Sequence, residues 1–475
     1  MSHSTALRER AGAGRIFTES ATAAEDRSVG RFGPWWSDRT RSNRFHVTPI
    51  CFADLEHWGF DPETGNLGHR SGKFFTIEGL AVRSDYGPVP RWSQPIINQP
   101  EIGLCGILVK YFDGVPYCLM QAKMEPGNVN TLQLSPTVQA TRSNSSRVHR
   151  GGGIRYLEHF VGADRGRVLV DVLQSEQGSW FYRKQNRNMV VEVTGEVAPH
   201  DDFCWLSLRQ VLDLLHVDNL VNMDARTVLS CMPFAPPQRD SGSRHAPQGF
   251  RQALARSLDR GAAARHDLGE ILSWLTEEKT RREVNTRLIP AREVTGWRRS
   301  DREIAHEAGR HFRVIAVHVE ASNREVPSWR QPLLVPSARG VIAFLTKRIE
   351  GVLHVLVHAR VEPGFIDKVE LGPTVQCTPE NHTDLPADRQ PRYLDYVLAA
   401  DPARIRFDAL LSEEGGRFLD AQNRYLVIEV EEDFPLRAPD GYRWLTIGQL
   451  GELLRHGHYV NVQARSLVAC LHSLW

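Results

Sequence analysis

The sequence predicts an α+β fold in which one sheet-centred unit, flanked by helices, is used twice. Three observations predict it. The chain repeats itself with an offset of 237 residues, as between Trp92 and Trp329. Short β-rich runs dominate both copies, and one helical pattern stands near the end of each. At 475 residues, the chain exceeds the roughly 250–300 residues at which a single core stops growing.

The repeat is long and chemically specific. It holds without a gap over about 69–193 of the first copy and then continues at an offset of 239 residues. A unit of this length is a duplicated domain, because solenoid units run to about 20–50 residues. Most matching positions are polar, charged, Gly or Pro, so the copies share more than a core pattern. The matched segments include 92–95 and 329–332, 125–127 and 362–364, 136–139 and 373–376, 155–156 and 392–393, 175–178 and 412–415, and 185–187 and 422–424.

Changes in composition divide the chain into four segments. Residues 1–33 are rich in Ala, Gly, Ser, Thr and Arg without periodicity, and we expect a mobile N-terminal tail. The first copy spans 34–235 and the second spans 266–475. Between them, 236–265 begins as a polar, Pro-containing linker, and its Ala- and Arg-rich part predicts a surface helix over 249–264.

Within each copy the strand signals come first and a helix follows. Strands are predicted over 74–82, 106–111, 117–122 and 189–193, with a hairpin turn at Asp113-Gly114. The second copy repeats this pattern over 340–347, 353–359 and 425–430, with a turn at Glu350-Gly351. Helical spacing, with Ser207 and Thr446 as candidate N-caps, predicts helices over 207–215 and 446–454.

The bulk composition excludes several classes of partner. A net charge of +1 argues against nucleic acid or an anionic membrane as the main partner. An apolar run long enough to span a membrane is absent, as is an apolar signal core, and we expect a cytoplasmic protein. The seven cysteines form no CxxC motif, which predicts reduced thiols and argues against a thiolate zinc site.

The densest group of chemically useful side chains lies in 121–128 and 133–141. Lys123 and Glu125 stand where a strand ends and a Pro-Gly loop begins, a common place for site residues. Strand alternation would place four hydrogen-bonding side chains on one face, namely Ser135, Thr137, Gln139 and Thr141. A solvated edge strand would show the same alternation, but its recurrence at Thr374 and Gln376 favours a polar pocket for a polyhydroxylated ligand.

The two copies differ at the positions of Lys123, Ser135 and His149, and the first copy is chemically richer. Lys123 becomes Arg360, which in effect cannot lose its proton. Ser135 becomes Gly372. His149 falls opposite a proline.

Arginines and aromatic residues supply a second set of candidates. Arg155 and Arg187 are suited to a diphosphate, while Trp92 and Tyr156 could stack on a base. A surface ion pair is the alternative for each arginine. The sequence contains no GxGxxG after a strand, no P-loop, no GxSxG and no HExxH. The chemistry therefore needs neither a dinucleotide fold nor a P-loop.

The motifs at 69–79, 92–96, 121–128, 133–141 and 362–376 together resemble one known family, the NDP-hexose 2,3-dehydratases of deoxysugar biosynthesis. The resemblance covers nearly the whole chain beyond the tail. It implies two tandem Nudix-like α/β modules, a homodimer, and a substrate of the dTDP-4-keto-6-deoxy-D-glucose type. A Nudix box is missing from both copies, so metal-dependent diphosphate hydrolysis is not expected.

The implied reaction removes the C2 hydroxyl and gives a 2,6-dideoxy-3,4-diketo nucleotide sugar, which a 3-ketoreductase would then take up. The substrate already carries a ketone, so no cofactor and no metal are expected. We expect Glu125 to be the base and Lys123 the enolate stabiliser or acid, with His149 or Tyr156 as a second acid/base. Substrate contacts are expected from Gln121, Ser135, Thr137, Gln139, Thr141, Arg155, Arg187 and Trp92. A second pocket is expected around Arg360, Glu362, Thr374, Gln376, Arg392 and Tyr393.

Two other functions stay open at this point. One is a non-catalytic protein that binds nucleotide sugars, against which the retained Lys123 and His149 argue mildly. The other is a degenerate Nudix-type hydrolase, which would need Mg²⁺ and a helix with several glutamates. The acidic pair Glu277-Glu278 is followed by basic residues, which argues against the hydrolase.

Overall fold

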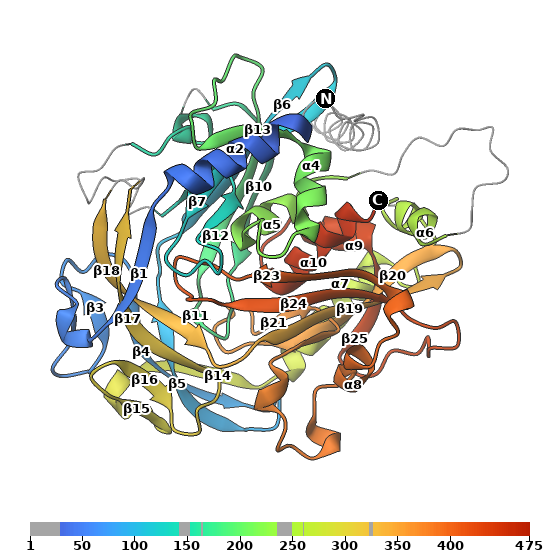
Figure 1. The fold of residues 1–475 in the computed structure, drawn as a ribbon. Helices are drawn as coiled ribbons and strands as arrows, with labels where there is room; N and C mark the ends of the chain where they lie inside the picture. The colour runs from blue at the N-terminus through green and yellow to red at the C-terminus, as the bar shows by residue number, and fades with distance from the viewer. Residues whose placement is uncertain (1–28, 142–152, 163–164, 235–248, 260, 323–325) are drawn as a thin grey trace.

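The computed structural model describes residues 29–141, 153–162, 165–234, 249–259, 261–322 and 326–475. Four β-sheets form the framework of the part that the structure describes, and helices lie between and around them (Figure 1). The predicted mixed α/β class and the use of one unit twice are confirmed, because most elements of one copy have a counterpart in the other. None of the helices described is long and apolar enough to cross a membrane.

Two large mixed sheets form the centre of the copies. The first contains β6 (Gly103–Phe112), β7 (Val115–Met124), β8 (Leu132–Ser135), β9 (Val138–Ala140), β10 (Arg167–Ser175), β12 (Gln185–Glu192) and β13 (Phe203–Ser207). The second contains β19 (Gly340–Ile349), β20 (Val352–Val361), β21 (Val369–Gly372), β22 (Val375–Cys377), β23 (Ile405–Ser412), β24 (Gln422–Glu429) and β25 (Tyr442–Thr446). Both predicted hairpin turns are confirmed, since Asp113-Gly114 and Glu350-Gly351 all have positive φ.

The two smaller sheets are shared between the copies. One contains β2 (Trp58–Phe60), β3 (Leu67–His69), β4 (Thr76–Ser84), β5 (Arg91–Asn98), β11 (Phe181–Tyr182) and β14 (Val284–Ile289). The other contains β1 (Phe45–Ile50), β15 (Trp297–Arg299), β16 (Glu303–His306), β17 (Phe312–Ala321) and β18 (Ser328–Pro336). Strand β1 of the first copy pairs with β17 of the second, and β14 of the second pairs with β4 of the first (Figure 1). The copies therefore exchange their first strands.

The helices described are α2 (Val29–Ser42), α4 (Leu208–Asp213), α5 (Met223–Ser230), α6 (Phe250–Ser257), α7 (Leu268–Arg281), α8 (Leu394–Leu398), α9 (Ile447–Leu453) and α10 (Val462–Ser473). Side chains cap the N-termini of most of these helices, namely α4, α5, α7, α9 and α10. The predicted N-caps are confirmed, and Ser207 and Thr446 each form a capping box with a glutamine three residues later. Helix α2 begins inside the segment expected as a tail, whose residues 1–28 lie outside the described part. Helix α6 is shorter than the surface helix predicted over 249–264; it exposes Arg251 and Arg256 and buries Leu254 and Ser257 against the core.

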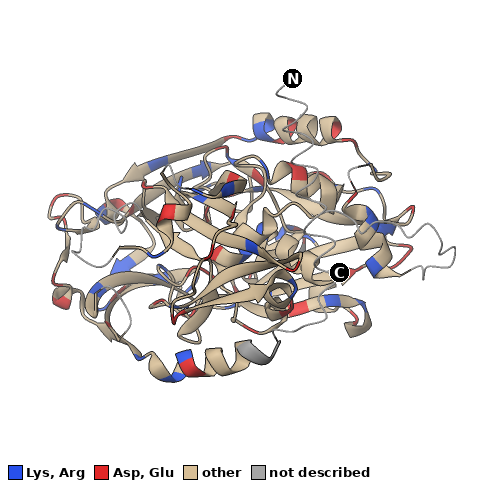
Figure 2. Ribbon diagram, turned by 90° about the horizontal axis from the view of Figure 1, so that it is seen from above, with Lys and Arg blue, Asp and Glu red and all other residues tan. Residues whose placement is uncertain are grey.

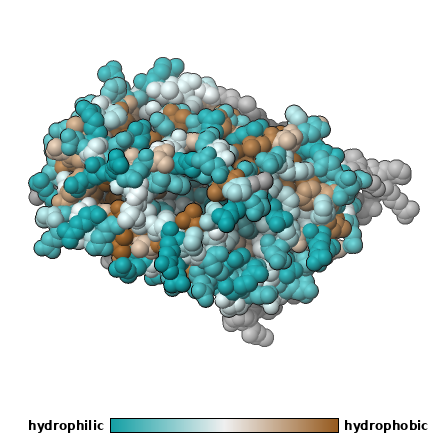
Figure 3. Space-filling model, turned by 90° about the horizontal axis from the view of Figure 1, so that it is seen from below, coloured by the Kyte–Doolittle hydropathy of each residue, from teal (hydrophilic) through white to brown (hydrophobic). Residues whose placement is uncertain are grey.

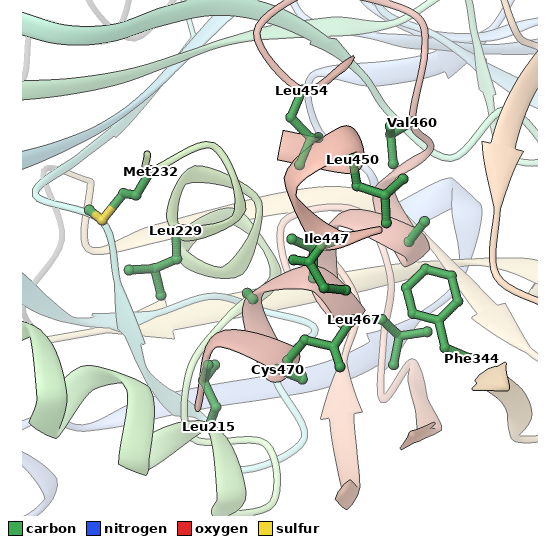
Figure 4. Close-up of a cluster of buried hydrophobic side chains, with 14 of the residues drawn as sticks. Leu215, Leu229, Met232, Phe344, Ile447, Leu450, Leu454, Val460, Leu467 and Cys470 are labelled. Carbon is green, nitrogen blue, oxygen red and sulfur yellow. The ribbon is translucent and has the colours of Figure 1, made fainter. Parts of the chain in front are cut away.

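Helices α5 and α10 lie side by side between the two central sheets (Figure 1). All of their residues are buried, and Leu229, Leu467 and Cys470 belong to the large apolar cluster around them (Figure 4). Each helix also carries one fully buried arginine. Arg226 donates to the carbonyl oxygen of Ser412 at 2.6 Å, and Arg465 donates to that of Ser175 at 2.5 Å. Each arginine thus bonds to a strand end of the other copy, and these bonds offset the loss of hydration.

The predicted continuous strand over 133–141 is wrong. The chain pairs with β7 as β8, breaks at Pro136-Thr137, and then pairs with β6 as β9. Direct pairing between β6 and β7 stops at Leu108 and Leu119. At that point the Thr137 hydroxyl accepts the N–H of Leu108 at 2.9 Å and donates to the carbonyl of Leu119 at 2.5 Å. The threonine therefore replaces one rung of the β6–β7 ladder.

The surface carries charges of both signs. Lys and Arg alternate with Asp and Glu over the described ribbon (Figure 2), as the near-zero net charge predicts. In the face of Figure 3, hydrophobic side chains are scattered among hydrophilic ones.

Candidate active site

The Glu-Pro-Gly motif of each copy contacts the Ser-Glu-x-Gly motif of the other. The N–H of Gly127 donates to the carbonyl of Gly415, and that of Gly364 donates to the carbonyl of Gly178, both at 2.7 Å. These positions require glycine, because a Cβ on Gly127 would lie 1.6 Å from the carbonyl oxygen of Phe418. Each candidate site is therefore built from both copies, which explains why the two motifs recur together.

In the first copy, Glu125 forms a polar network with Lys123, Gln139 and Asn222. The Lys123 ammonium lies 3.3 Å from Glu125 Oε1, and both side chains are buried. Gln139 Nε2 donates to the same carboxylate oxygen at 3.0 Å. Asn222, the N-cap of α5, donates to Gln139 Oε1 at 3.1 Å and so fixes the orientation of that amide. The arrangement holds one carboxylate beside one buried ammonium at the end of β7.

The second copy has a matching cluster around Glu362. Arg360 Nε lies 2.9 Å from Glu362 Oε1, and Gln376 Nε2 donates to that oxygen at 2.8 Å. Asn461, the N-cap of α10, donates to Gln376 Oε1 at 2.8 Å. The N–H of Ser179 from the first copy donates to Glu362 Oε2 at 3.2 Å.

The clusters differ in two carboxyl groups that sequence reasoning missed. Asp224, in the first turn of α5, has Gln463 as its counterpart in α10. Glu414, in the loop that contacts Gly127, has Gln177 as its counterpart. The difference between Gln177 and Glu414 inside an otherwise repeated motif was visible in the sequence and could have found the second group.

Burial changes the acidity of the carboxyl groups near Glu125. It raises the pKa of Glu414 to about 8, with the charges of Glu125 and Asp224 adding to the shift and Arg417 opposing it. It also raises the pKa of Asp224 to about 7, with the charges of Glu176 and Glu125 adding to it. The pKa of Glu176 is raised to about 7 as well, mainly by burial. Near neutral pH the first-copy site therefore holds carboxyl groups that can donate a proton.

Several predicted site residues come together around Glu125. Lys123 and Gln139 contact it directly, and the Ser135 hydroxyl donates to Gln139 Oε1 at 3.4 Å. Gln121 lies opposite Ser135 in the β7–β8 pairing. Thr141 is half-buried just beyond β9.

The prediction that Thr137 and Thr374 bind sugar hydroxyls is corrected by the structure. Both are almost fully buried. The Thr137 hydroxyl is already bonded within the β6–β7 ladder. The Thr374 hydroxyl likewise accepts the N–H of Leu345 and donates to the carbonyl of Leu356. Their recurrence reflects a repeated structural need.

Arg155 and Tyr156 lie beside a polar cavity of about 380 Å³. Arg155 lines it together with Arg39 and His200, and its guanidinium lies 2.8 Å from the His200 ring. The Tyr156 hydroxyl donates to the carbonyl of Ala198 and accepts the N–H of His200, both at 2.9 Å. These two hydrogen bonds hold the loop at 198–200 in place, and burial raises the pKa of Tyr156.

The structure does not bring Arg187 or Trp92 to this cluster. Arg187 forms a two-pronged ion pair with Asp171 on β10, with its Nε and Nη2 donating at 2.7 and 2.6 Å. Trp92 donates to Gln94 and packs in the smaller sheet. In the second copy, Arg392 adjoins Tyr393, whose pKa is raised by burial. His149 lies outside the described residues.

Comparison with known proteins decides the family. The sequence model of NDP-hexose 2,3-dehydratases matches residues 30–232 and 268–471. The chain belongs to this family. It is 56% identical over 463 residues to a dTDP-4-dehydro-6-deoxy-alpha-D-glucopyranose 2,3-dehydratase of Saccharopolyspora spinosa, covering 97% of this chain and 95% of the relative. It is 51% identical to enzymes of the same name from Amycolatopsis orientalis, covering 92% and 89%, and Streptomyces violaceoruber, covering 93% and 97%.

Proposed function

We propose that this protein is a hydro-lyase that removes the C2 hydroxyl of dTDP-4-keto-6-deoxy-D-glucose in deoxysugar biosynthesis. The observation that carries the proposal is the buried contact between Lys123 and Glu125, beside Asp224 and Glu414, which are glutamines at the equivalent positions of the second-copy site. Family membership and the names of the relatives support the substrate.

The reaction follows from the position of the substrate ketone. The C4 carbonyl acidifies the C3 proton, and Glu125 removes that proton while Lys123 stabilises the enolate oxygen at C4. The enolate electrons then form the C2–C3 double bond, and the C2 hydroxyl leaves as water after gaining a proton. The resulting enol carries its hydroxyl on C3 and tautomerises to the 3,4-diketone by taking up a proton at C2. Neither a redox cofactor nor a hydrolytic step is needed for this balance.

Other residues bind and orient the substrate. Arg155 lines the 380 Å³ cavity and supplies positive charge for the diphosphate, while Arg39 in the same lining is paired with Asp202. Gln139 holds the Glu125 carboxylate at 3.0 Å and is itself held by Asn222, which fixes the direction of the base. In the second copy, Arg360, Glu362, Gln376, Arg392 and Tyr393 form a second nucleotide-sugar pocket.

The finer architecture and setting belong to the same proposal. The two units are Nudix-like modules over 34–235 and 266–475, and the family match over 30–232 and 268–471 supports these boundaries. The protein works as a cytoplasmic homodimer. Its diketo product is consumed by a 3-ketoreductase, because the new carbonyl at C3 must be reduced to restore a hydroxyl there.

The test is to incubate the purified protein with dTDP-4-keto-6-deoxyglucose in D₂O and follow the sugar by NMR. Loss of the C2 hydroxyl with deuterium entering at C2 supports the dehydratase. Saturable binding without turnover would instead show a nucleotide-sugar binding protein, and Mg²⁺-dependent diphosphate cleavage would show a hydrolase.

A further inference from the structure

The segment 414–416 of the second copy lies directly on the carboxylate of Glu125. A Cβ on Gly415 would lie 3.1 Å from Glu125 Cβ, and a Cβ on Gly416 would lie 3.7 Å from Glu125 Oε1. The same Cβ on Gly416 would lie 2.5 Å from Glu414 Oε1. Both carboxyl groups therefore flank one glycine, and Glu414 reaches the first-copy site from the other half of the chain.

Glu414 is more accessible than the neighbouring carboxyl groups. Its Oε2 atom, like Oδ1 of Asp224 and Oε2 of Glu176, has no hydrogen-bond partner within the described part of the chain. The residue is half-buried, whereas Glu176 and Asp224 are almost fully buried. By contrast, both Lys123 and Gln139 are bonded to Glu125. An unpaired carboxyl at a partly open site is a group that a substrate hydroxyl can satisfy.

The charges around Glu414 favour its protonated form. The groups that face it are Arg417 on its own loop, Lys123 and Glu125 at the end of β7, and Asp224 at the start of α5. Burial and the two carboxylates raise its pKa to about 8, although Arg417 and Lys123 oppose them. The Arg417 guanidinium donates to Gln99 and to the carbonyl of Gly416, so its hydrogen bonds in the described part of the chain go to groups other than the Glu414 carboxyl.

We propose that Glu414, contributed by the second copy, is the general acid that protonates the departing C2 hydroxyl in the first-copy site. The inference rests on the proposed dehydration. Its proton moves from the Glu414 carboxyl to the C2 oxygen as the C2–O bond breaks, so the hydroxyl leaves as water. The carboxylate that remains regains a proton from solvent. The two proton transfers are therefore assigned to different residues. Glu125 removes the C3 proton, and Glu414 protonates the leaving hydroxyl.

The second-copy site provides a natural comparison for this assignment. There a loop of the first copy places Gln177 at the position equivalent to Glu414, and Gln177 donates from Nε2 to Glu413 Oε2 at 2.8 Å. Glutamine therefore fits this loop, and Glu414→Gln is the matched variant.

The test separates the two proton transfers. In D₂O, the Glu414→Gln protein should still exchange the C3 proton of recovered substrate but should lose water elimination by about 10²–10⁴-fold. A 2-deoxy-2-fluoro analogue of the substrate should restore elimination to the variant, because fluoride leaves without a full proton transfer. A Glu414→Asp variant, which keeps the carboxyl, should retain part of the activity.

The outcomes distinguish the inference from the function on which it rests. If the parent protein does not dehydrate the sugar, the proposed function fails and the inference fails with it. If the parent dehydrates and Glu414→Gln eliminates water as fast, Glu414 is not the acid. If the variant loses C3 exchange, water elimination and fluoride release together, the residue has a structural role and the inference is also wrong.

Discussion

Gly127 donates its backbone N–H to the carbonyl of Gly415 at 2.7 Å, across the boundary between the two copies. This hydrogen bond places the Glu414 loop of the second copy against the Glu125 site of the first. Glu125 stands two residues before Gly127, and Glu414 stands directly before Gly415. The matching bond between Gly364 and Gly178 does the same for the second site. Together with the exchanged strands β1 and β14, these bonds make each site a product of both copies.

Replacing Gly127 by alanine should destabilise the protein and reduce its activity. The new Cβ would meet the backbone of Phe418 at 1.6 Å, so the loops must separate. We expect a loss of about 1–3 kcal/mol or more in the free energy of unfolding, measured in urea. Gly451→Ala in α9 is the control, because its Cβ meets nothing within 4 Å and should be neutral or stabilising. A Gly127→Ala protein as stable as the parent would contradict the close packing of these loops.

Thr137→Val should lower stability without raising KM. The substitution keeps the shape but removes the hydroxyl that bonds Leu108 and Leu119. Two buried backbone groups are then left unpaired, at about 1–3 kcal/mol each. Urea unfolding and steady-state kinetics measure the two effects separately. Thr374→Val should show the same loss in the second copy, whereas a large rise in KM for Thr137→Val would restore the sugar-binding role.

Arg226→Lys should be strongly destabilising although the charge is kept. The guanidinium donates to the carbonyls of Val221 and Ser412 and to the Ser466 hydroxyl, and a lysine cannot span all three. Each buried carbonyl left unpaired costs about 1–3 kcal/mol. Arg298→Lys, at an exposed ion pair, should change the unfolding free energy by less than about 0.5 kcal/mol. Equal effects of the two substitutions would mean that Arg226 is not an anchor between the copies.

The raised carboxyl pKa values predict a stability that falls as pH rises. Asp224 and Glu414 keep their protons up to about pH 7 and 8, whereas in the unfolded chain they lose them near pH 4. Their stabilising contribution is therefore complete below about pH 4 and is lost as pH rises through 7 to 8. Each extra bound proton contributes a slope of about 1.4 kcal/mol per pH unit within this window.

The slope is measured by urea unfolding between pH 5 and 8. The parent protein is compared with the double variant that carries both Asp224→Asn and Glu414→Gln. The double variant should lose less stability than the parent over this range. Identical slopes would show that the two groups titrate normally in the folded protein.

Features of the fold that depend on neighbouring residues were predicted correctly from the sequence. The turn at Asp113-Gly114 and the cap at Ser207 depend on residues within a few positions, so the sequence predicted both. The exchange of β1 and β14 could not be predicted, because the strands are equivalent and each has a pattern that fits either copy. Alternation over 133–141 gave a wrong continuous strand, since a strand that changes partner at Thr137 has the same pattern.

The site was predictable where the motif was contiguous. Lys123, Glu125 and Gln139 come together as expected. Glu414 reaches Glu125 only because loops from the two copies pack together, and no spacing in the sequence encodes that contact. In the sequence, Asp224 has the pattern of an ordinary acidic residue in the first turn of a helix. Its closeness to Glu125 depends on the tertiary packing, which the sequence pattern does not give.

The most direct test of the composite first-copy site compares Glu125→Gln with Glu362→Gln. Each variant removes one carboxylate from equivalent networks, so each serves as the structural control for the other. With dTDP-4-keto-6-deoxyglucose in D₂O, Glu125→Gln should lose both C3 exchange and water elimination, while Glu362→Gln should keep both. A Glu125→Gln protein that dehydrates the sugar at the parent rate would contradict the account.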